Sequence, residues 1–307
     1  MASPFGPLVA IVNPRAGKGR VGQELPDLER TLRARGLAYR FAVTEGPGDA
    51  TRLAREALDG GSRFLVAVGG DGTVHEVVNG MLSDGRPVVP DAVLGDVAAG
   101  SGCDLVRTFG LPGDATRACI HLQGDATYPL DLGRIRCAGD GGNVDRIFVN
   151  VAEAGLGGAV ATRALRLPRR LGQARYFVGF WLTLPGYRLA QVRVAAGRQV
   201  YEGPAYAIII GNAQFYGGGM KISPRSYPGD GVLDVLVFTG PKTDAFTLLP
   251  RIYRGDHVPH DHVVELRSRD RITIEADRPI EIEADGEPVG RTPATIDVIP
   301  HPIRMKL

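Results

Sequence analysis

The feature that most constrains this chain is an apolar run, residues 64–68, that ends in Gly69-Gly70-Asp71-Gly72-Thr73. A Phe/Leu/Val/Ala run without polar alternation predicts a parallel strand buried on both faces. The glycines permit positive φ and let an anion approach the backbone, and Thr73 is placed to cap a helix over residues 74–81. A tight turn with a cap is the alternative. Because open α/β sheets bind ligands at the carboxyl ends of their strands, we favour a phosphate-sized anion site.

Composition excludes several broad classes of protein. The length of 307 residues suits two domains. A hydrophobic content of 44% and a charged content of 23% fit a chain with buried cores and exclude a disordered one. The formal charge of +2 gives no reason to expect nucleic acid as a partner. It neither requires nor excludes weak attraction to an anionic membrane surface.

The cysteines and the apolar runs bear on the compartment. Cys103, Cys119 and Cys137 lack the spacing of a zinc site or of a disulfide framework, which indicates a reducing cytoplasm. Residues 1–7 show no positive segment followed by an apolar one, so we expect no secretory signal. No uncharged apolar run reaches about 18 residues, so we expect no transmembrane segment.

The first third of the chain alternates strands with helices. Strands are predicted at residues 8–12, 39–43, 64–68 and 92–98, with helical segments between them, which indicates an open α/β sheet with right-handed parallel crossovers. The first strand is followed by the loop Asn13-Pro14-Arg15-Ala16-Gly17-Lys18-Gly19. Its Asn13, Arg15 and Lys18 are available to a nucleotide, although the loop fails the Walker pattern. A glycine turn with solvated basic residues is an equal alternative.

A second glycine-rich loop follows the strand at residues 92–98. It reads Gly100-Ser101-Gly102-Cys103-Asp104 and precedes another helical segment. Two such loops at one sheet edge can face each other and bring Asp71 and Asp104 together. Paired carboxylates there suit Mg²⁺, which prefers oxygen ligands and substrate phosphates. The alternative for Asp104 is a charge at a helix N-terminus that favours the macrodipole.

The pattern of predicted secondary structure changes beyond residue 123. Short strands separated by Gly, Pro and Asp predict a second, mostly antiparallel domain of sandwich type, with a boundary near residues 124–130. Residues 244–253 form the one helix predicted among these strands, capped by Thr243 or Asp244. The predicted strands are residues 128–132, 146–151, 191–196, 205–211, 233–238, 263–268, 271–276, 280–284 and 295–299.

Residues 176–184 form an uncharged, aromatic-rich segment that is too short to cross a bilayer. As a helix it is apolar nearly all round, which suits burial in a core or a partly exposed wall that receives an apolar substrate. We favour the core slightly. The flanking arginines keep an interfacial role open, because basic and aromatic residues together suit the headgroup region. They are Arg169, Arg170, Arg175 and Arg188.

Two later clusters carry glycines and acids. Residues 211–222 follow a strand and contain Gly217-Gly218-Gly219, which fits a ligand loop or a long hairpin bend. Asp285-Gly286-Glu287 follows the strand at residues 280–284, and Asp-Gly is a strong signal for a hairpin turn.

Together these motifs resemble the diacylglycerol kinase catalytic-domain family, which includes soluble bacterial lipid kinases and the sphingosine and ceramide kinases. The resemblance runs from about residue 8 to the C-terminus. It implies an N-terminal ATP-binding α/β domain, residues 1–127 with a return at about 292–307. It also implies a C-terminal β-sandwich lipid-substrate domain, residues 128–291, with the active site in the cleft between the two. The motifs are Asn13 to Gly17, Gly69 to Thr73 with Glu76 to Gly80, Gly100 to Asp104, Gly211 to Met220, Asp230 to Asp234, and Asp285 to Glu287.

The resemblance also implies roles for individual residues. Asp71 and Asp104 organise Mg²⁺ through water and the ATP phosphates. Asp285 and Glu287 lie near the acceptor hydroxyl, one of them as general base. Asp230 resembles a residue that helps hold a second, structural Mg²⁺. The nucleotide-binding residues are Asn13, Pro14, Arg15, Gly17, Lys18, Gly69, Gly70, Gly72, Thr73, Gly100, Ser101 and Gly102.

The chain departs from the family pattern at two positions. Cys103 stands where the family has asparagine, so the hydrogen bond of that amide is lost and nucleotide affinity falls. Gly229 replaces the first acid of an Asp-Asp-Gly, which puts the structural metal in doubt.

We therefore expect an ATP- and Mg²⁺-dependent kinase of a lipid hydroxyl, with diacylglycerol or a related lipid at the membrane surface as acceptor. The expected location is the cytoplasm, with contact at the inner face of the membrane, and a homodimer stays open. One rival is a kinase of a soluble acceptor such as NAD, because NAD kinases share the glycine-aspartate motif. The other is a lipid- or nucleotide-binding regulator that has lost catalysis, which Cys103 motivates.

Overall fold

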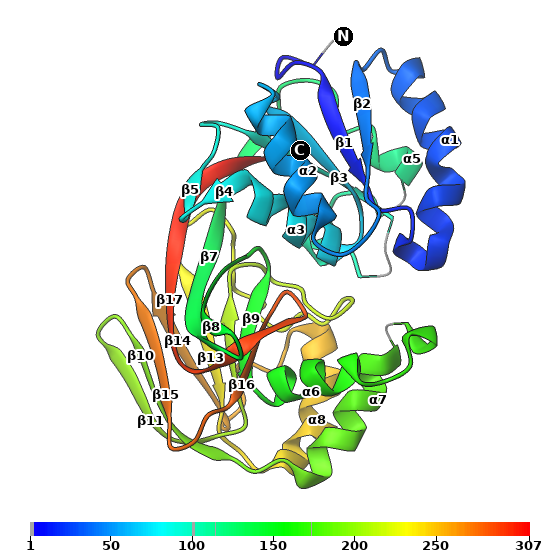
Figure 1. The fold of residues 1–307 in the computed structure, drawn as a ribbon. Coiled ribbons are helices and arrows are strands. Elements are labelled where there is room, and N and C mark those ends of the chain that lie inside the picture. The colour runs from blue at the N-terminus through cyan, green and yellow to red at the C-terminus, as the bar shows by residue number, and fades with distance from the viewer. Residues whose placement is uncertain (1–2, 100–101, 114, 173) are drawn as a thin grey trace. The chain divides into compact units, whose positions relative to one another are not determined.

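The computed structural model describes residues 3–99, 102–113, 115–172 and 174–307 (Figure 1). Its contacts divide the chain into two compact units. Unit 1 comprises Met1–Asp131 and Pro300–Leu307, and unit 2 comprises Leu132–Ile299. Two long strands, β7 (Thr127–Gly139) and β17 (Glu287–Lys306), each begin in one unit and end in the other.

Unit 1 contains a parallel sheet with the strand order β17-β6-β3-β1-β2. The end of β17 joins this sheet through the parallel register Arg304↔Val93 and Met305↔Leu94. The other strands are β1 (Leu8–Val12), β2 (Tyr39–Val43), β3 (Phe64–Gly69) and β6 (Val93–Ala98), and a small hairpin consists of β4 (Leu82–Ser83) and β5 (Arg86–Pro87). The C-terminal residues therefore complete the sheet that the N-terminal residues start.

Helices cover both faces of this sheet, with α1 and α5 on one face and α2 and α3 on the other (Figure 1). Every residue of β1, β3 and β6 is buried. Strands covered on both faces are continuously apolar, which is why these runs were readable in the sequence. The helices are η1 (Ala16–Gly19), α1 (Arg20–Ala34), α2 (Asp49–Asp59), α3 (Asp71–Met81), α4 (Asp104–Thr108) and α5 (Ala115–Ala118).

The start of α3 differs from the prediction. The helix begins at Asp71 with Gly70 as its N-cap residue and has no side-chain cap, so the prediction that Thr73 caps it is wrong. Thr73 lies in the first turn, where its hydroxyl accepts a hydrogen bond from Asn13. The Thr73 side chain, which was predicted to cap the helix, therefore links the loop after β3 to the loop that contains Asn13.

Unit 2 is built on antiparallel strands. The order β14-β13-β12-β9-β16-β17 forms its main path, β15 joins β17 to β10, and β10 also pairs with β11. Inward-facing aliphatic residues of these strands form one core cluster. The strands are β8 (Gly142–Phe148), β9 (Val151–Gly155), β10 (Ala190–Ala196), β11 (Gln199–Ala205), β12 (Ala207–Gly211), β13 (Leu233–Phe238), β14 (Val263–Ser268), β15 (Ile272–Ala276) and β16 (Glu281–Ala284).

Several helices accompany these strands, and one was not predicted. Helix α6 (Leu156–Leu165) has Gly157 and Gly158 in its first turn, and a Cβ on Gly158 would lie 2.3 Å from the Glu281 carbonyl oxygen. Gly158 therefore permits close packing on β16. The helix α8 (Ala245–Arg254) was predicted, but the Asp244 side chain makes no cap bond and pairs with His262 instead. The others are η2 (Arg169–Leu171), α7 (Ala174–Thr183), η3 (Leu184–Gly186) and η4 (Lys242–Asp244).

The aromatic segment at residues 176–184 lies mostly in α7. Gly179 and Thr183 are its buried residues, whereas Phe177 is 62% exposed and Leu182 is 52% exposed. Phe180 and Trp181 pack against a core cluster, so the core interpretation holds for one side of this segment and the partly exposed wall for the other. Among the described residues, every helix is too short or too polar to span a bilayer.

Candidate functional site

Three loops of unit 1 meet at the carboxyl ends of β1, β3 and β6. The Asn13 amide donates to the Thr73 hydroxyl at 3.3 Å, and the Ala99 N–H donates to the Gly69 carbonyl at 2.8 Å. Arg20, at the start of α1, donates to the Ala99 carbonyl at 3.3 Å. The loops that the sequence singled out separately therefore form one connected surface, where open α/β sheets place ligands.

Asp71 fixes the relation between two of these loops. Its carboxylate accepts hydrogen bonds from the backbone N–H groups of Cys103 at 2.9 Å and of Asp104 at 2.7 Å. These N–H groups are at the N-terminus of α4, where a carboxylate is favoured by both hydrogen bonding and the helix dipole. Asp71 thus positions Asp104, which is almost completely buried.

Close backbone approach explains two of the glycines in these loops. Gly17 has φ of 60°, and a Cβ on it would lie 2.7 Å from the Ala99 carbonyl oxygen. A Cβ on Gly69 would lie 2.3 Å from the Thr73 hydroxyl. A larger residue at position 17 would separate two loops that now touch, and one at position 69 would displace the Thr73 side chain.

An anion that binds at this surface would contact exposed backbone and positively charged side chains. Gly72 is exposed with open space where a Cβ would be, and the side chains of Arg15 and Lys18 are exposed. Pro14 and Gly70 are half-buried in the same loops, and Gly102 is buried. Gly100 and Ser101, also predicted to bind nucleotide, lie outside the described residues. The predicted nucleotide residues that are described therefore gather on three neighbouring loops.

Asp96 is a residue that sequence reasoning missed. It lies within β6, is buried, and its Oδ1 atom has no hydrogen-bond partner among the described residues. Burial, and then the negative charge of Asp71, raise the pKa of this carboxyl well above its usual range. An acid inside an otherwise apolar strand was the available signal. Asp71, Asp96 and Asp104 are therefore three neighbouring acids of unit 1, and their oxygen atoms are of the kind that Mg²⁺ prefers together with nucleotide phosphates.

Glu76 has a structural role that the sequence did not reveal. Its two carboxylate oxygens accept hydrogen bonds from the N–H groups of Gly48 at 3.0 Å and Ala50 at 3.1 Å. It therefore caps the N-terminus of α2 from α3, which holds together the two helices on this face of the sheet.

In unit 2, Asp285 occupies the predicted hairpin turn between β16 and β17. Asp285 and Gly286 have φ of 50° and 86°, as in the turn type that favours Asp-Gly. The Asp285 carboxylate accepts from the backbone N–H groups of Val149 at 2.8 Å, Asn150 at 2.8 Å and Val151 at 3.2 Å. It therefore fixes the bend that divides β8 from β9, a stretch that we had predicted as one strand.

Two buried glutamates lie beside this turn. Glu153 and Glu283 are directly opposite each other on β9 and β16, and both are buried. Burial raises the pKa of Glu153 to about 7, although a hydrogen bond from the Gly157 N–H partly lowers this pKa. Burial, and then the charge of Glu153, raise the pKa of Glu283 well above its usual range. This pair was not predicted, because alternating acids in a strand usually face solvent.

Glu287 and Tyr176 complete the group around the turn. Glu287 is exposed, and the Tyr176 hydroxyl donates to the Gly286 carbonyl at 3.1 Å. Burial first, and then the charge of Glu287, raise the pKa of Tyr176. Unit 2 therefore presents one exposed acid, Glu287, next to a fixed turn and a buried glutamate pair.

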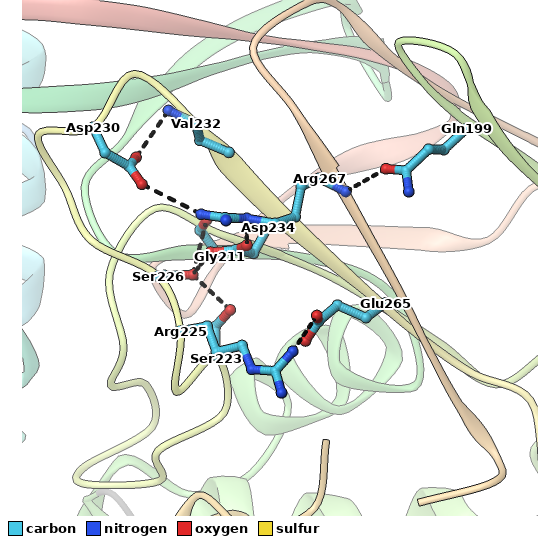
Figure 2. Close-up of polar contacts among 10 residues, drawn as sticks. All are labelled: Gln199, Gly211, Ser223, Arg225, Ser226, Asp230, Val232, Asp234, Glu265 and Arg267. Atoms are coloured by element: carbon cyan, nitrogen blue, oxygen red, sulfur yellow. Dashed lines mark hydrogen bonds and ion pairs between the residues drawn. The ribbon is translucent and has the colours of Figure 1, made fainter. Parts of the chain in front are cut away.

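Asp230 lies away from this group, at the start of β13. Its carboxylate accepts from the Val232 N–H at 3.0 Å and from Arg267 at 3.3 Å (Figure 2). Asp234 lies next to it and pairs with the same arginine. The donor atoms that a cation would use here are therefore already engaged by a guanidinium.

Comparison with known proteins matches the two parts of the chain to two family models. Residues 7–135 match the family model for the diacylglycerol kinase catalytic domain. Residues 150–306, half of the chain, match the model for the YegS C-terminal NAD kinase beta sandwich-like domain. The predicted fold class, an N-terminal α/β domain followed by a β-sandwich domain, is confirmed.

Individual relatives match over almost the whole chain. A diacylglycerol kinase of Mycobacterium tuberculosis is 29% identical over 305 residues, covering 98% of this chain and 95% of the relative. A probable lipid kinase YegS-like protein of Pseudomonas aeruginosa is 31% identical over 293 residues, covering 95% and 92%.

Solved structures show the same fold. A diacylglycerol kinase structure from Bacillus anthracis superimposes with a TM-score of 0.73 at 22% identity, covering 99% of this chain and 97% of the other. Yeast NADH kinase, at 12% identity and a TM-score of 0.51, shares the fold alone. Given the matched domain models and the relatives that cover nearly its full length, the chain belongs to the diacylglycerol kinase catalytic-domain family.

Proposed function

We propose that this protein is a lipid kinase that transfers the γ-phosphate of ATP to a lipid hydroxyl in the presence of Mg²⁺, with diacylglycerol as the first acceptor to test. The observation that carries the proposal is the meeting of the three loops of unit 1, held by Asp71 at the start of α4. The relatives named diacylglycerol kinase support the acceptor class.

Phosphoryl transfer depends on positioning and on neutralisation of charge, more than on covalent chemistry by the protein. Arg15 and Lys18 are exposed beside the loops and meet the negative phosphates. Asp71 holds Asp104 in place, and the carboxylates at positions 71, 96 and 104 are the residues that would hold Mg²⁺. When bound, the ion supplies the positive charge that offsets charge on the transferred phosphoryl group.

The acceptor side belongs to unit 2. A general base needs an acid that is ionised and can reach a substrate hydroxyl. Glu287 is exposed, whereas Asp285 is engaged by three backbone N–H groups and shapes the turn. We therefore assign the base to Glu287 and a positioning role to Asp285.

An exposed aromatic surface on α7 and α8 favours a lipid over a soluble acceptor. It consists of the exposed Phe177, Leu182 and Phe246 and the half-buried Trp181, whose ring centroid lies 5.1 Å from that of Phe246. Exposed apolar side chains with arginines nearby suit the headgroup region of a membrane. Arg170, Arg251 and Arg254 supply that charge. Contact with the cytoplasmic face of a membrane would follow.

The test is transfer of labelled γ-phosphate to diacylglycerol, sphingoid bases, ceramide and NAD, the lipids being presented in mixed micelles. We expect transfer to a lipid. We also expect Asp71→Asn to lower kcat by about 10²-fold, since it releases the loop that Asp104 occupies. Asp27→Asn, which changes an exposed acid of α1, is the matched control and keeps full activity.

Each alternative has its own outcome in this assay. Transfer to NAD alone would identify a kinase of a soluble acceptor. Binding of ATP without transfer to any acceptor would identify a regulator that has lost catalysis. Full transfer by Asp71→Asn would contradict the role given to Asp71.

A further inference from the structure

An arginine bridges two carboxylates at the start of β13. The Arg267 Nε atom lies 2.6 Å from the Asp234 Oδ1 atom, and Arg267 Nη2 donates to Asp230 at 3.3 Å. Figure 2 shows the guanidinium between the two acids. One planar cation therefore neutralises both side chains.

The fold requires a cation at this place. Asp234 is 2% exposed, and it lies directly opposite Arg267 in the antiparallel register of β13 and β14. A buried carboxylate without a partner would be strongly destabilising. Burial does raise the pKa of Asp234, and the Ser226 hydroxyl and Arg267 act against that rise.

The same acids organise the segment that leads into β13. The Ser226 hydroxyl donates to Asp234 at 2.8 Å, and it lies 3.2 Å from the Gly211 carbonyl oxygen and 2.6 Å from the Ser223 hydroxyl. These bonds join residues 223–234 to the end of β12. The order of this segment therefore depends on how the charge of Asp234 is balanced.

The donor set does not fit the second, structural Mg²⁺ that the family resemblance implies. Three of the four carboxylate oxygens of Asp230 and Asp234 accept hydrogen bonds, from the Val232 N–H, the Ser226 hydroxyl and Arg267. The fourth, Asp234 Oδ1, forms an ion pair with Arg267 Nε. Position 229, where the family pattern has a further acid, is glycine. Mg²⁺ prefers several oxygen ligands in near-octahedral geometry, and here a guanidinium occupies the space between the acids.

We infer that Arg267 is the resident cation of this site, so that the segment 223–234 is ordered without a divalent metal ion. The inference concerns the stability of unit 2 and does not depend on the proposed kinase activity. It predicts that chelation of divalent metal ions leaves the stability of the folded protein unchanged. A protein that holds a structural Mg²⁺ would instead lose stability.

The first test uses the full-length wild-type protein without nucleotide. After dialysis we expect no stoichiometric Mg²⁺ by elemental analysis, and the same Tm in excess EDTA and in excess Mg²⁺. A bound Mg²⁺ that survives dialysis, or a Tm that falls on chelation and returns with Mg²⁺, would overturn the inference.

The second test removes the guanidinium. Arg267→Met keeps most of the aliphatic stem and leaves Asp234 buried without its cation, so we expect the Tm to fall by about 5 °C. Arg225→Met is the matched control, because Arg225 pairs with Glu265 nearby but is 61% exposed, and its Tm should change by about 1 °C or less. An Arg267→Met protein with the wild-type Tm would overturn the inference. If that variant does not fold, Arg267→Lys takes its place, because lysine keeps the positive charge but lacks the planar guanidinium. Arg267→Lys should fold, with a Tm below that of the wild type. A wild-type Tm for Arg267→Lys would count against the assignment.

Discussion

Replacing Glu153 by glutamine should remove that residue's contribution to the pH dependence of the stability of unit 2, while Glu283 keeps its own. The glutamine keeps a carbonyl oxygen that can accept the Gly157 N–H, now donated to Glu153 at 2.6 Å. It removes the ionisable group whose pKa burial raises to about 7. Each pKa unit corresponds to about 1.4 kcal/mol, so a rise from the usual 4.5 to about 7 is worth on the order of 3 kcal/mol.

Whether the free energy of unfolding rises or falls with pH depends on whether the folded or the unfolded state binds the Glu153 proton more tightly. Well below the unfolded-state pKa of 4.5, Glu153 is protonated in both states and carries no penalty. Between 4.5 and about 7 the unfolded chain ionises first, so the free energy of unfolding falls as pH rises. Above that window the penalty is constant. Relative to wild type, Glu153→Gln should therefore gain on the order of 3 kcal/mol between about pH 5 and about pH 8.

The assay is urea unfolding across that pH range, followed by the fluorescence of Trp181. This is the one tryptophan of the sequence, and it packs against a core cluster of unit 2. Glu202→Gln, which changes an exposed acid of β11, is the control and should keep the wild-type pH dependence. If the difference between Glu153→Gln and wild type is the same at every pH, the burial of an ionisable Glu153 is refuted.

Two further predictions concern unit 1. Cys103 is the N-cap residue of α4 with φ of 58°, a conformation and a position that asparagine accepts better, so Cys103→Asn should raise stability by about 1 kcal/mol and tighten ATP binding. Thermal unfolding and ATP titration measure both effects, and a loss of stability would contradict the reasoning. Glu76→Ala removes the cap of α2 and should cost about 1 kcal/mol in denaturant unfolding, whereas Glu56→Ala, in an exposed ion pair, should cost less than about 0.5 kcal/mol. Equal effects of the two substitutions would show that the cap contributes nothing.

The elements best predicted from sequence were those in which local pattern and burial agree. Residues 8–12 and 64–68 are strands buried on both faces, and their apolar runs are continuous for that reason. The long strand β17 was predicted only at residues 295–299, because its prolines read as breaks. Helix α6 was missed because glycines at its start are poor helix formers, while the tertiary structure needs Gly158 against β16.

The candidate site was predictable to a similar extent. Loops that follow buried strands can be recognised in the sequence by their glycines and aspartates. Asp71 and Asp104 could therefore be placed at one sheet edge. The pairing of Glu153 with Glu283 depends on which strands are neighbours, and Asp234 with Arg267 depends on the register of β13 and β14. Neither relation is local in the chain, so no spacing in the sequence could reveal it.

The route of β17 has a consequence for the order of assembly during synthesis. The sheet of unit 1 gains its strand next to β6 from residues at the very end of the chain, and Lys306 is fully buried there with its amine donating to the Ala126 carbonyl at 2.9 Å. A ribosome that has released residues 1–131 has therefore delivered an incomplete sheet, in which β6 is an unpaired edge. Unit 1 reaches its final form only after all of unit 2 has been translated.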